Sequence, residues 1–320
     1  MDRKMLIALP ELTKAQRQLV EKKAAEKGFT AIFCDDMEDA AKEAAEAEII
    51  LSGNPALVAH TKALRWFCSP AAGVDHFVKP WEDAPAGAVF SNSSGAYGVT
   101  ISEHIIMVTL EIMRQRESYR QIVSRREWAR LLPVKSILGS RIMLLGTGDI
   151  GCETVRKLRG FRPATIVGMN TSGRNPEGLF DRTEKIDDLS ELLPETDVLI
   201  MSLPGTKATR HILDGKMLAL LPDGAIIVNV GRGSSIDEAA LLPELQAGRL
   251  FAALDVFEKE PLPQDSPLYE APNLLITPHV SGNMTLPYTL QRITDLFLED
   301  FERYAKGETP ERAVDMERGY

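Results

Sequence analysis

Short apolar runs alternate with longer amphipathic segments over most of the chain. Between the first two runs, the Lys- and Glu-rich segment 13–27 is predicted to be a helix that is capped by Thr13 and ended by Gly28. Because strand-like runs and helices alternate, the fold class is predicted to be α/β. The strands predicted in the first hundred residues are 5–9, 29–34, 48–52 and 64–69.

A longer helix is predicted over 101–113, where apolar residues recur at helical spacing on two faces. We therefore expect this helix to be buried on both sides. The basic segment 114–130 follows and contains Trp128; it is interpreted as a solvated helix with an aromatic anchor or as a dimer arm. The first apolar face comprises Ile101, Ile105, Val108 and Ile112, and the second comprises Ile106, Met107, Leu110 and Met113.

A second series of apolar runs follows, with helical segments between most of its members. This alternation predicts a doubly wound, mostly parallel sheet. The amphipathic tail 289–304 is expected to pack back on the N-terminal unit, which would make the first domain discontinuous. The runs of the second series are 142–145, 165–169, 198–202, 225–230, 252–256 and 274–277.

Composition and charge exclude several classes of protein. A length of 320 residues predicts two domains at roughly 150 residues each. The net charge of −9 argues against binding to nucleic acid or an anionic membrane through bulk charge. Cys34, Cys68 and Cys152 are too scattered to predict a disulfide framework or a zinc site. With neither a signal-peptide core nor a membrane span, the sequence predicts a soluble, cytoplasmic protein.

The segment 146–151 has the pattern GxGxxG directly after a predicted strand. Gly146 would form the tight turn, Gly148 would let a pyrophosphate approach, and Gly151 would allow close packing of helix and strand. The phosphates would lie at the N-terminus of a helix that starts near Asp149. The motif is weak alone, but this context predicts a dinucleotide site that also includes Ile150.

The residue that selects between NAD and NADP is expected at the end of the next strand, where this chain has Asn170. NAD sites usually place an acidic residue there, whereas Asn170 has no charge to repel a 2′-phosphate. Thr171, Ser172 and Arg174 supply hydroxyls and a guanidinium that could hold that phosphate. The segment is also good turn composition on any protein. We favour NADP over NAD, with Asn170, Ser172 and Arg174 as cofactor-binding residues.

Three polar residues, Arg232, Glu260 and His279, follow predicted strands of the second series. In an open parallel sheet the carboxyl ends of the strands meet at the ligand crevice. Each residue alone has a plain structural explanation, as a surface arginine, a loop glutamate or a buried histidine. Together, on one nucleotide-binding domain, they are typical of a dehydrogenase site.

These motifs resemble those of the D-isomer-specific 2-hydroxyacid dehydrogenase family. The similarity extends from about residue 64 to residue 282, and the first sixty residues match only in their α/β alternation. The matching segments are 72–75, 92–95, 102–104, 146–151, 229–233, 254–256 with Glu260 and Pro261, and 277–282.

The resemblance implies a role for each polar residue. Arg232 would hold the carboxylate of a 2-keto acid and polarise its carbonyl. His279 would protonate the new alkoxide and act as the base in the reverse direction. Glu260, hydrogen-bonded to the other ring nitrogen, would fix the imidazole and favour its protonated form. Arg232 and His279 would thus also bind the substrate.

The resemblance also implies further binding positions. The backbone amides of Ala72 and Gly73 would hold the substrate carboxylate, and Tyr97 is either a substrate contact or a packed aromatic residue. Asp149 stands where many relatives have a basic or small residue, so we expect it to face solvent or cap its helix. The remaining cofactor positions are Leu203, Pro204 and Thr209 beside the adenosine, Val230 and Gly231 beside the nicotinamide, and Asp255 at its carboxamide.

The fold implied is a Rossmann-type doubly wound parallel sheet with a second, smaller flavodoxin-like α/β domain. Residues 100–283 would form the dinucleotide-binding domain, and 1–99, completed by 284–320, the substrate domain. The implied activity is hydride transfer between NAD(P)H and a small 2-keto acid, giving the D-2-hydroxy acid, without a metal. A homodimer through 102–138 is implied. A dinucleotide-sensing, corepressor-like protein and a formate dehydrogenase are the alternatives.

Overall fold

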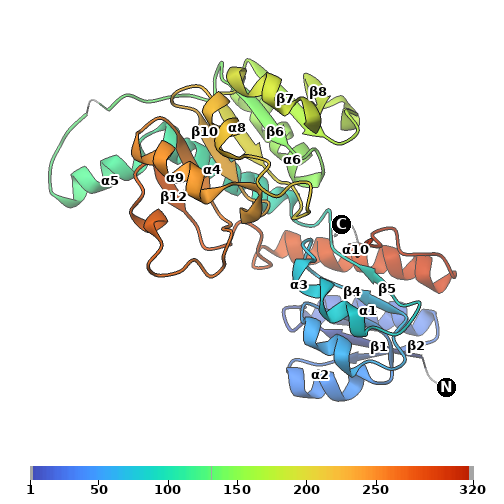
Figure 1. Cartoon of the computed structure of the whole chain (residues 1–320). Helices are drawn as coiled ribbons and strands as arrows, with labels where there is room; N and C mark the ends of the chain where they lie inside the picture. Colours follow the sequence, from blue (N-terminus) through green and yellow to red (C-terminus); the bar gives the residue numbers. More distant parts are fainter. Residues whose placement is uncertain (1–2, 131, 317–320) are drawn as a thin grey trace. The chain divides into compact units, whose positions relative to one another are not determined.

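The chain folds into two units. The computed structural model describes residues 3–130 and 132–316. The first unit comprises Met1–Tyr97 and Asn283–Tyr320, and the second comprises Gly98–Gly282 (Figure 1).

The first unit is built on a five-stranded parallel sheet in the order β2-β1-β3-β4-β5. This is the flavodoxin-like order. The apolar pattern predicts the first four strands but not β5, which is only three residues long. The strands are β1 (Arg3–Ala8), β2 (Phe29–Phe33), β3 (Ala47–Ser52), β4 (Trp66–Cys68) and β5 (Val89–Ser91).

The helices of this unit include one from the C-terminal segment. Phe297 of that helix stacks on Trp66 of β4 with ring centroids 5.2 Å apart, and both side chains are fully buried. Thr13 caps the first helix in a capping box with Gln16, as the sequence predicts. The helices are α1 (Lys14–Glu26), α2 (Met37–Ala44), α3 (Asp75–Val78) and α10 (Pro287–Ala305).

The second unit is built on a seven-stranded parallel sheet in the order β12-β11-β10-β9-β6-β7-β8. This is the Rossmann order with one strand added at an edge. The apolar pattern does not predict β8, because its sequence Arg-Thr-Glu-Lys is polar. The strands are β6 (Arg141–Leu145), β7 (Thr165–Asn170), β8 (Arg182–Lys185), β9 (Val198–Met201), β10 (Ile226–Asn229), β11 (Phe251–Leu254) and β12 (Leu274–Ile276).

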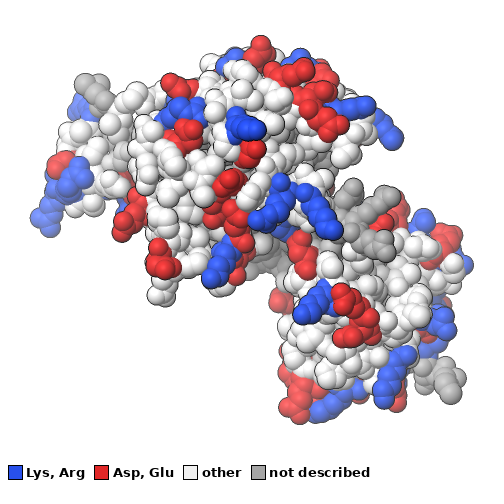
Figure 2. Space-filling model, in the orientation of Figure 1, with Lys and Arg blue, Asp and Glu red and all other residues white. Residues whose placement is uncertain are grey.

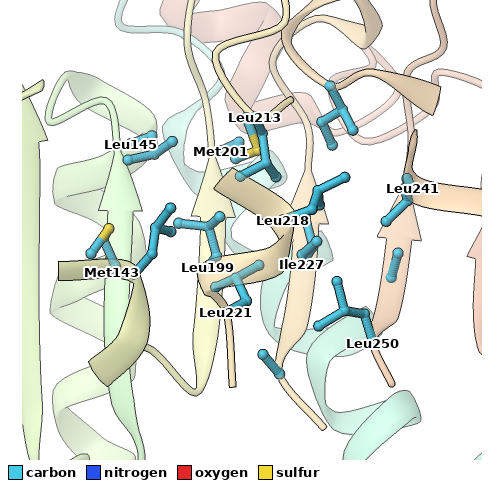
Figure 3. Close-up of a cluster of buried hydrophobic side chains, with 14 of the residues drawn as sticks. Met143, Leu145, Leu199, Met201, Leu213, Leu218, Leu221, Ile227, Leu241 and Leu250 are labelled. Carbon is cyan, nitrogen blue, oxygen red and sulfur yellow. The ribbon is translucent and has the colours of Figure 1, made fainter. Parts of the chain in front are cut away.

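Buried aliphatic side chains fill the space between this sheet and the helices beside it. Figure 3 shows Leu199 and Met201 of β9 and Ile227 of β10 pointing toward Leu218 of α8. Polar loops connect these apolar strands to the helices, so the loops lie at the ends of the strands. The helices are α4 (Gly98–Met113), α5 (Arg116–Ser124), α6 (Asp149–Leu158), α7 (Leu189–Leu192), α8 (Gly215–Leu220) and α9 (Glu238–Gln246).

The expectation that the helix over 101–113 is buried on both sides is wrong within this chain. Ile101, Ile105 and Val108 of the first face and Met113 of the second are buried, but Met107 is 47% exposed and Ile106, Leu110 and Ile112 are only partly buried. α4 packs against α6, β10 and β11, and Met107 is the side chain of these two faces that stays exposed. Trp128 is 84% exposed.

Charged residues of both signs are spread over the surface. On the face drawn in Figure 2, Lys and Arg side chains are interspersed with Asp and Glu.

Across 3–130 and 132–316, no helix is long and apolar enough to cross a membrane. The cytoplasmic location stays a prediction.

Candidate active site

The glycine-rich loop joins β6 to α6. Gly146 has a φ of +102°, and a Cβ there would lie 2.8 Å from the Ser202 hydroxyl. A Cβ on Gly151 would collide with the carbonyl oxygen of Gly146, whereas nothing lies within 4 Å of the Cβ position of Gly148. Of the three glycines, only Gly148 has open space at its Cβ position. This open position and the N-terminus of α6 fit the pyrophosphate of a dinucleotide.

Asp149 and Ile150 form the first turn of α6. Asp149 is exposed, and its Oδ2 accepts the backbone N–H of Gly98 at 2.8 Å. The carboxylate thus lies at the N-terminus of α4, where a negative charge is favourable. It caps α4 and is exposed to solvent.

Asn170 organises the turn that follows β7. Its Oδ1 accepts the N–H groups of Ser172 at 2.9 Å and Gly173 at 2.6 Å. Its Nδ2 donates to Thr147 Oγ1 in the glycine-rich loop at 2.7 Å and to the carbonyl of Arg174 at 2.9 Å. Ser172 Oγ donates to Asn170 Oδ1 at 3.1 Å and accepts the N–H of Arg174 at 3.3 Å. The carboxamide and this hydroxyl shape the turn, and the Arg174 side chain is exposed.

The loops after β9 and β10 contain five more of the predicted cofactor positions, which are Leu203, Pro204, Thr209, Val230 and Gly231. Thr209 Oγ1 donates to the carbonyl of Pro204 at 2.6 Å and accepts an N–H of the same loop at 2.9 Å. Its hydroxyl therefore shapes the loop. A Cβ on Gly231 would lie 2.6 Å from the carbonyl oxygen of Leu203, so a glycine is needed where the two loops meet. Val230 and Leu203 are buried there.

Arg232 follows β10 in a turn that Asn229 holds. Nδ2 of the buried Asn229 donates to the Arg232 carbonyl at 3.0 Å. The Arg232 guanidinium is partly exposed and donates to the preceding carbonyl at 2.8 Å. A Cβ on Gly233 would overlap the backbone of Phe257. The turn that carries Arg232 therefore packs directly against the segment that leads from β11 to Glu260.

Glu260 and His279 form a hydrogen-bonded pair. Nδ1 of His279 lies 2.6 Å from Oε2 of Glu260, and Oε1 of Glu260 accepts the N–H of Phe257 at 2.9 Å. The His279 side chain is half exposed. The pair fixes one ring nitrogen and orients the carboxylate, so the other ring nitrogen is available for proton exchange.

Asp255 immediately follows β11, and its carboxylate holds the loop that carries His279. Oδ1 accepts the Thr277 hydroxyl at 2.6 Å and the N–H of Val280 at 2.9 Å, and Oδ2 accepts the N–H of Ser281 at 3.0 Å. The Asp255 carbonyl accepts the N–H of His279 at 2.8 Å, and His279 has a left-handed φ of +53°. This role is not evident from the sequence, because the loop begins more than twenty residues later.

Asp255 is 1% exposed but charged. Burial opposes ionisation, but hydrogen bonds from Ser281, Thr277 and the backbone outweigh it and hold the pKa of Asp255 below its usual range. His104 on α4 supports the same loop, with Nε2 3.3 Å from Thr277 Oγ1. Burial lowers the pKa of His104, with Asp255 and Glu111 opposing it.

The loop predicted to hold the substrate carboxylate lies in the first unit. The backbone N–H groups of Ala72 and Gly73 have no acceptor among the residues that the structure describes. Nδ2 of Asn92 donates to the carbonyl of Ala72 at 2.8 Å, and the Tyr97 hydroxyl donates to the carbonyl of Pro70 at 2.7 Å. Burial raises the pKa of Tyr97 to about 12, so the hydroxyl keeps its proton. Tyr97 is 7% exposed, which fits the packed aromatic residue that was one of its two interpretations.

Known proteins resemble this chain over most of its length. A family model described as D-isomer specific 2-hydroxyacid dehydrogenase, NAD binding domain, matches residues 106–281. Glyoxylate/hydroxypyruvate reductase A from Salmonella paratyphi B is 32% identical over 226 residues, which is 70% of each protein. None of these similarities supports the corepressor-like alternative.

Solved structures agree with the family match. A D-isomer specific 2-hydroxyacid dehydrogenase family protein from Aeromonas salmonicida has a TM-score of 0.86 at 32% identity, over 99% of this chain and 100% of that one. An NADPH-dependent glyoxylate/hydroxypyruvate reductase from Sinorhizobium meliloti, in complex with NADP and sulfate, has a TM-score of 0.82 at 26% identity, with the same coverage.

The hydrogen bonds to Asp255 predict how stability depends on pH. Because the folded pKa is lowered, the stability that the carboxylate contributes is present above its ordinary pKa of about 3.9 and is lost as the pH falls through the folded pKa. We expect Asp255→Asn to lower the free energy of unfolding at pH 7 by about 1–3 kcal/mol, with the difference shrinking toward pH 3. Urea unfolding at pH 7, 5, 4 and 3 measures this. Asp265→Asn, at an exposed position of the same unit, is the control, and a pH-independent loss in Asp255→Asn would contradict the assignment.

Proposed function

Because this chain belongs to the D-isomer specific 2-hydroxyacid dehydrogenase family, we propose that it is a 2-keto acid reductase that works through Arg232, Glu260 and His279. The enzyme transfers a hydride between NAD(P)H and a small 2-keto acid, and the product is the D-2-hydroxy acid. The observation that carries this assignment is the 2.6 Å contact between His279 Nδ1 and Glu260 Oε2. The three residues follow β10, β11 and β12, which are neighbours in the sheet.

Arg232 binds and polarises the substrate. Its guanidinium is planar, permanently charged and able to donate to a carboxylate and a carbonyl oxygen at once. Donation to the carbonyl oxygen stabilises the negative charge that develops there during reduction. The Asn229 bond to the Arg232 carbonyl keeps the turn in place during this change.

His279 supplies the proton. Nδ1 donates to Glu260, so Nε2 is the nitrogen that gives a proton to the substrate oxygen in reduction and takes it back in oxidation. The Glu260 carboxylate stabilises the positive ring before the transfer. NADPH, when bound, supplies the hydride.

Two observations support the proposed substrate class: the backbone N–H groups of one loop and the substrates of similar proteins. The backbone N–H groups of Ala72 and Gly73 have no acceptor within the described chain and suit the carboxylate of a 2-keto acid. We assign 1–99 with 284–320 to substrate binding and 100–283 to the dinucleotide. The relatives from Salmonella and Sinorhizobium are reductases of glyoxylate and hydroxypyruvate. We therefore propose these two acids as the first substrates to test.

NADP is the proposed cofactor. Asn170 replaces the acidic residue that would repel a 2′-phosphate, and the exposed Arg174 lies four residues later. The remaining residues assigned to the dinucleotide are Gly146, Gly148, Asp149, Ile150, Gly151, Ser172, Leu203, Pro204, Thr209, Val230, Gly231 and Asp255. The reductase from Sinorhizobium was solved with NADP.

A homodimer through 102–138 is proposed on the exposed apolar side chains of that segment. Met107 on α4 is 47% exposed and Val123 on α5 is 63% exposed. Trp128, Val134 and Leu138 are also more than half exposed. Such a concentration of exposed apolar residues in one segment is typical of an interface.

Removing the ring of His279 should abolish most turnover. General acid catalysis is worth about 10²–10⁴-fold, so we expect His279→Ala to lower kcat by that range with little change in NADPH binding. NADPH oxidation with glyoxylate, hydroxypyruvate, pyruvate and 2-ketobutyrate measures kcat. His211→Ala is the matched control, because His211 forms the same kind of contact with Glu258 at 3.0 Å and also has a positive φ. Wild-type kcat in His279→Ala would refute the proton role, and tight NADPH binding without turnover of any acid would favour a sensor.

The cofactor preference predicts a kcat/KM for NADPH at least about tenfold above that for NADH, a difference of about 1.4 kcal/mol. Asn170→Asp should reduce the ratio, because it places a negative charge near the 2′-phosphate and loses two donated hydrogen bonds. Steady-state rates with both cofactors at saturating glyoxylate measure the ratio. A wild-type preference for NADH would overturn the cofactor assignment and leave the enzyme class standing.

The dimer predicts a mass in solution of about twice 35.3 kDa. Met107→Glu should shift the protein to the monomer, because it would bury a charge in the proposed interface. Analytical ultracentrifugation measures the mass. Val78→Glu, at a residue 40% exposed in the first unit, should leave the dimer intact; dissociation by that variant alone would place the interface elsewhere.

A further inference from the structure

Lys185, the last residue of β8, lies opposite Asn170, the last residue of β7. The two strands lie side by side at one edge of the sheet (Figure 1). Parallel strands lie about 4.8 Å apart, so Lys185 emerges beside the turn that Asn170 organises. A Cβ on Gly173 would lie 3.5 Å from Lys185 Cγ, which places the lysine stem against that turn.

The carboxylates of the loop between β7 and β8 are already paired. Glu177 and Asp181 form ion pairs of 2.5 Å and 2.9 Å with arginines in and after α6. Lys185 and Arg174 are both exposed, and neither forms an ion pair with any residue in 3–130 or 132–316. The turn therefore carries two cations whose charge is available to a ligand.

Asn170 cannot take the part that an acidic residue has in NAD sites. Its Oδ1 already accepts two backbone N–H groups and the Ser172 hydroxyl, and its Nδ2 donates two hydrogen bonds. The carbonyl oxygen has two lone pairs, so no acceptor is left for a ribose hydroxyl. This edge of the sheet offers positive charge in place of an acceptor, which suits a phosphate better than a hydroxyl.

We propose that Lys185 and Arg174 together bind the 2′-phosphate of NADP(H), with Asn170 as the positioning residue that holds the turn. This inference rests on the proposed NADP preference and adds a residue from a strand that the sequence motif does not reach. Lys185 contributes a mobile point charge and Arg174 a planar donor group. Asn170 acts through the turn, because its bond to Thr147 ties this site to the glycine-rich loop.

The test uses binding without hydride transfer. Isothermal titration calorimetry of the full chain compares adenosine 2′,5′-bisphosphate with 5′-AMP, which differ only in the 2′-phosphate. Lys185→Ala should weaken binding of the bisphosphate by about 10- to 100-fold, as expected for a lost charge-assisted hydrogen bond, and leave 5′-AMP unchanged. Lys185→Arg should restore most of the affinity. Arg182→Ala is the matched control, because Arg182 is an exposed cation at the other end of the same strand, opposite Val167.

The outcomes separate the two proposals. If the wild-type protein prefers the bisphosphate and Lys185→Ala keeps that preference, Lys185 has no part in the site and the NADP assignment stands. If the wild-type protein binds both nucleotides equally, the NADP preference itself is overturned, and the two-cation site with it. Equal weakening of both nucleotides by Lys185→Ala would indicate a general loss of the adenosine site and also refute the proposal.

Discussion

The buried carboxylate of Asp255 is the group on which the conformation of the loop that carries His279, the proposed proton donor, depends. It collects the Thr277 hydroxyl and two backbone N–H groups of the next loop, while its own backbone N–H bonds the carbonyl of Asn229 and its carbonyl bonds His279. One residue thus ties together the ends of β10, β11 and β12. Hydrogen bonds from these donors stabilise the buried charge, and they hold the loop in which His279 has its left-handed conformation.

Close approach of backbones completes the same region. Gly231 lies against Leu203 and Gly233 against Phe257, and a side chain at either position would push the loops apart. Because the backbone at Gly233 packs directly on the backbone of Phe257, the turn that carries Arg232 and the segment that orients Glu260 are held against each other. Such preorganisation is what a charge-stabilising site requires, since groups that must move into place lose part of their effect.

The turn after β7, where the cofactor is proposed to bind, is also held by the hydrogen bonds of one residue. The Asn170 carboxamide uses both its oxygen and its nitrogen in hydrogen bonds to the turn after β7 and to Thr147 of the glycine-rich loop. A neutral residue therefore holds the turn, and the proposed selectivity for a 2′-phosphate is assigned to the charged side chains around it. The loop of the first unit that is proposed to bind the substrate is built in the same way: Asn92 and Tyr97 hold its carbonyl groups, and the N–H groups of Ala72 and Gly73 have no acceptor among the described residues.

The sequence by itself determined the α/β class, most strands, the cap at Thr13 and the strand–loop–helix context of the glycine motif, because apolar periodicity, capping and turn chemistry are local. Only the tertiary structure decided the position of the polar strand β8, the exposure of Met107 on α4, and the partners of Asp255, Asn170 and Tyr97. Each of these depends on strand register and on groups twenty or more residues away, or on a neighbouring loop. Local pattern can name the residues of such a site, but the packing of the strands decides which of them hold the loops and which are left to meet a ligand.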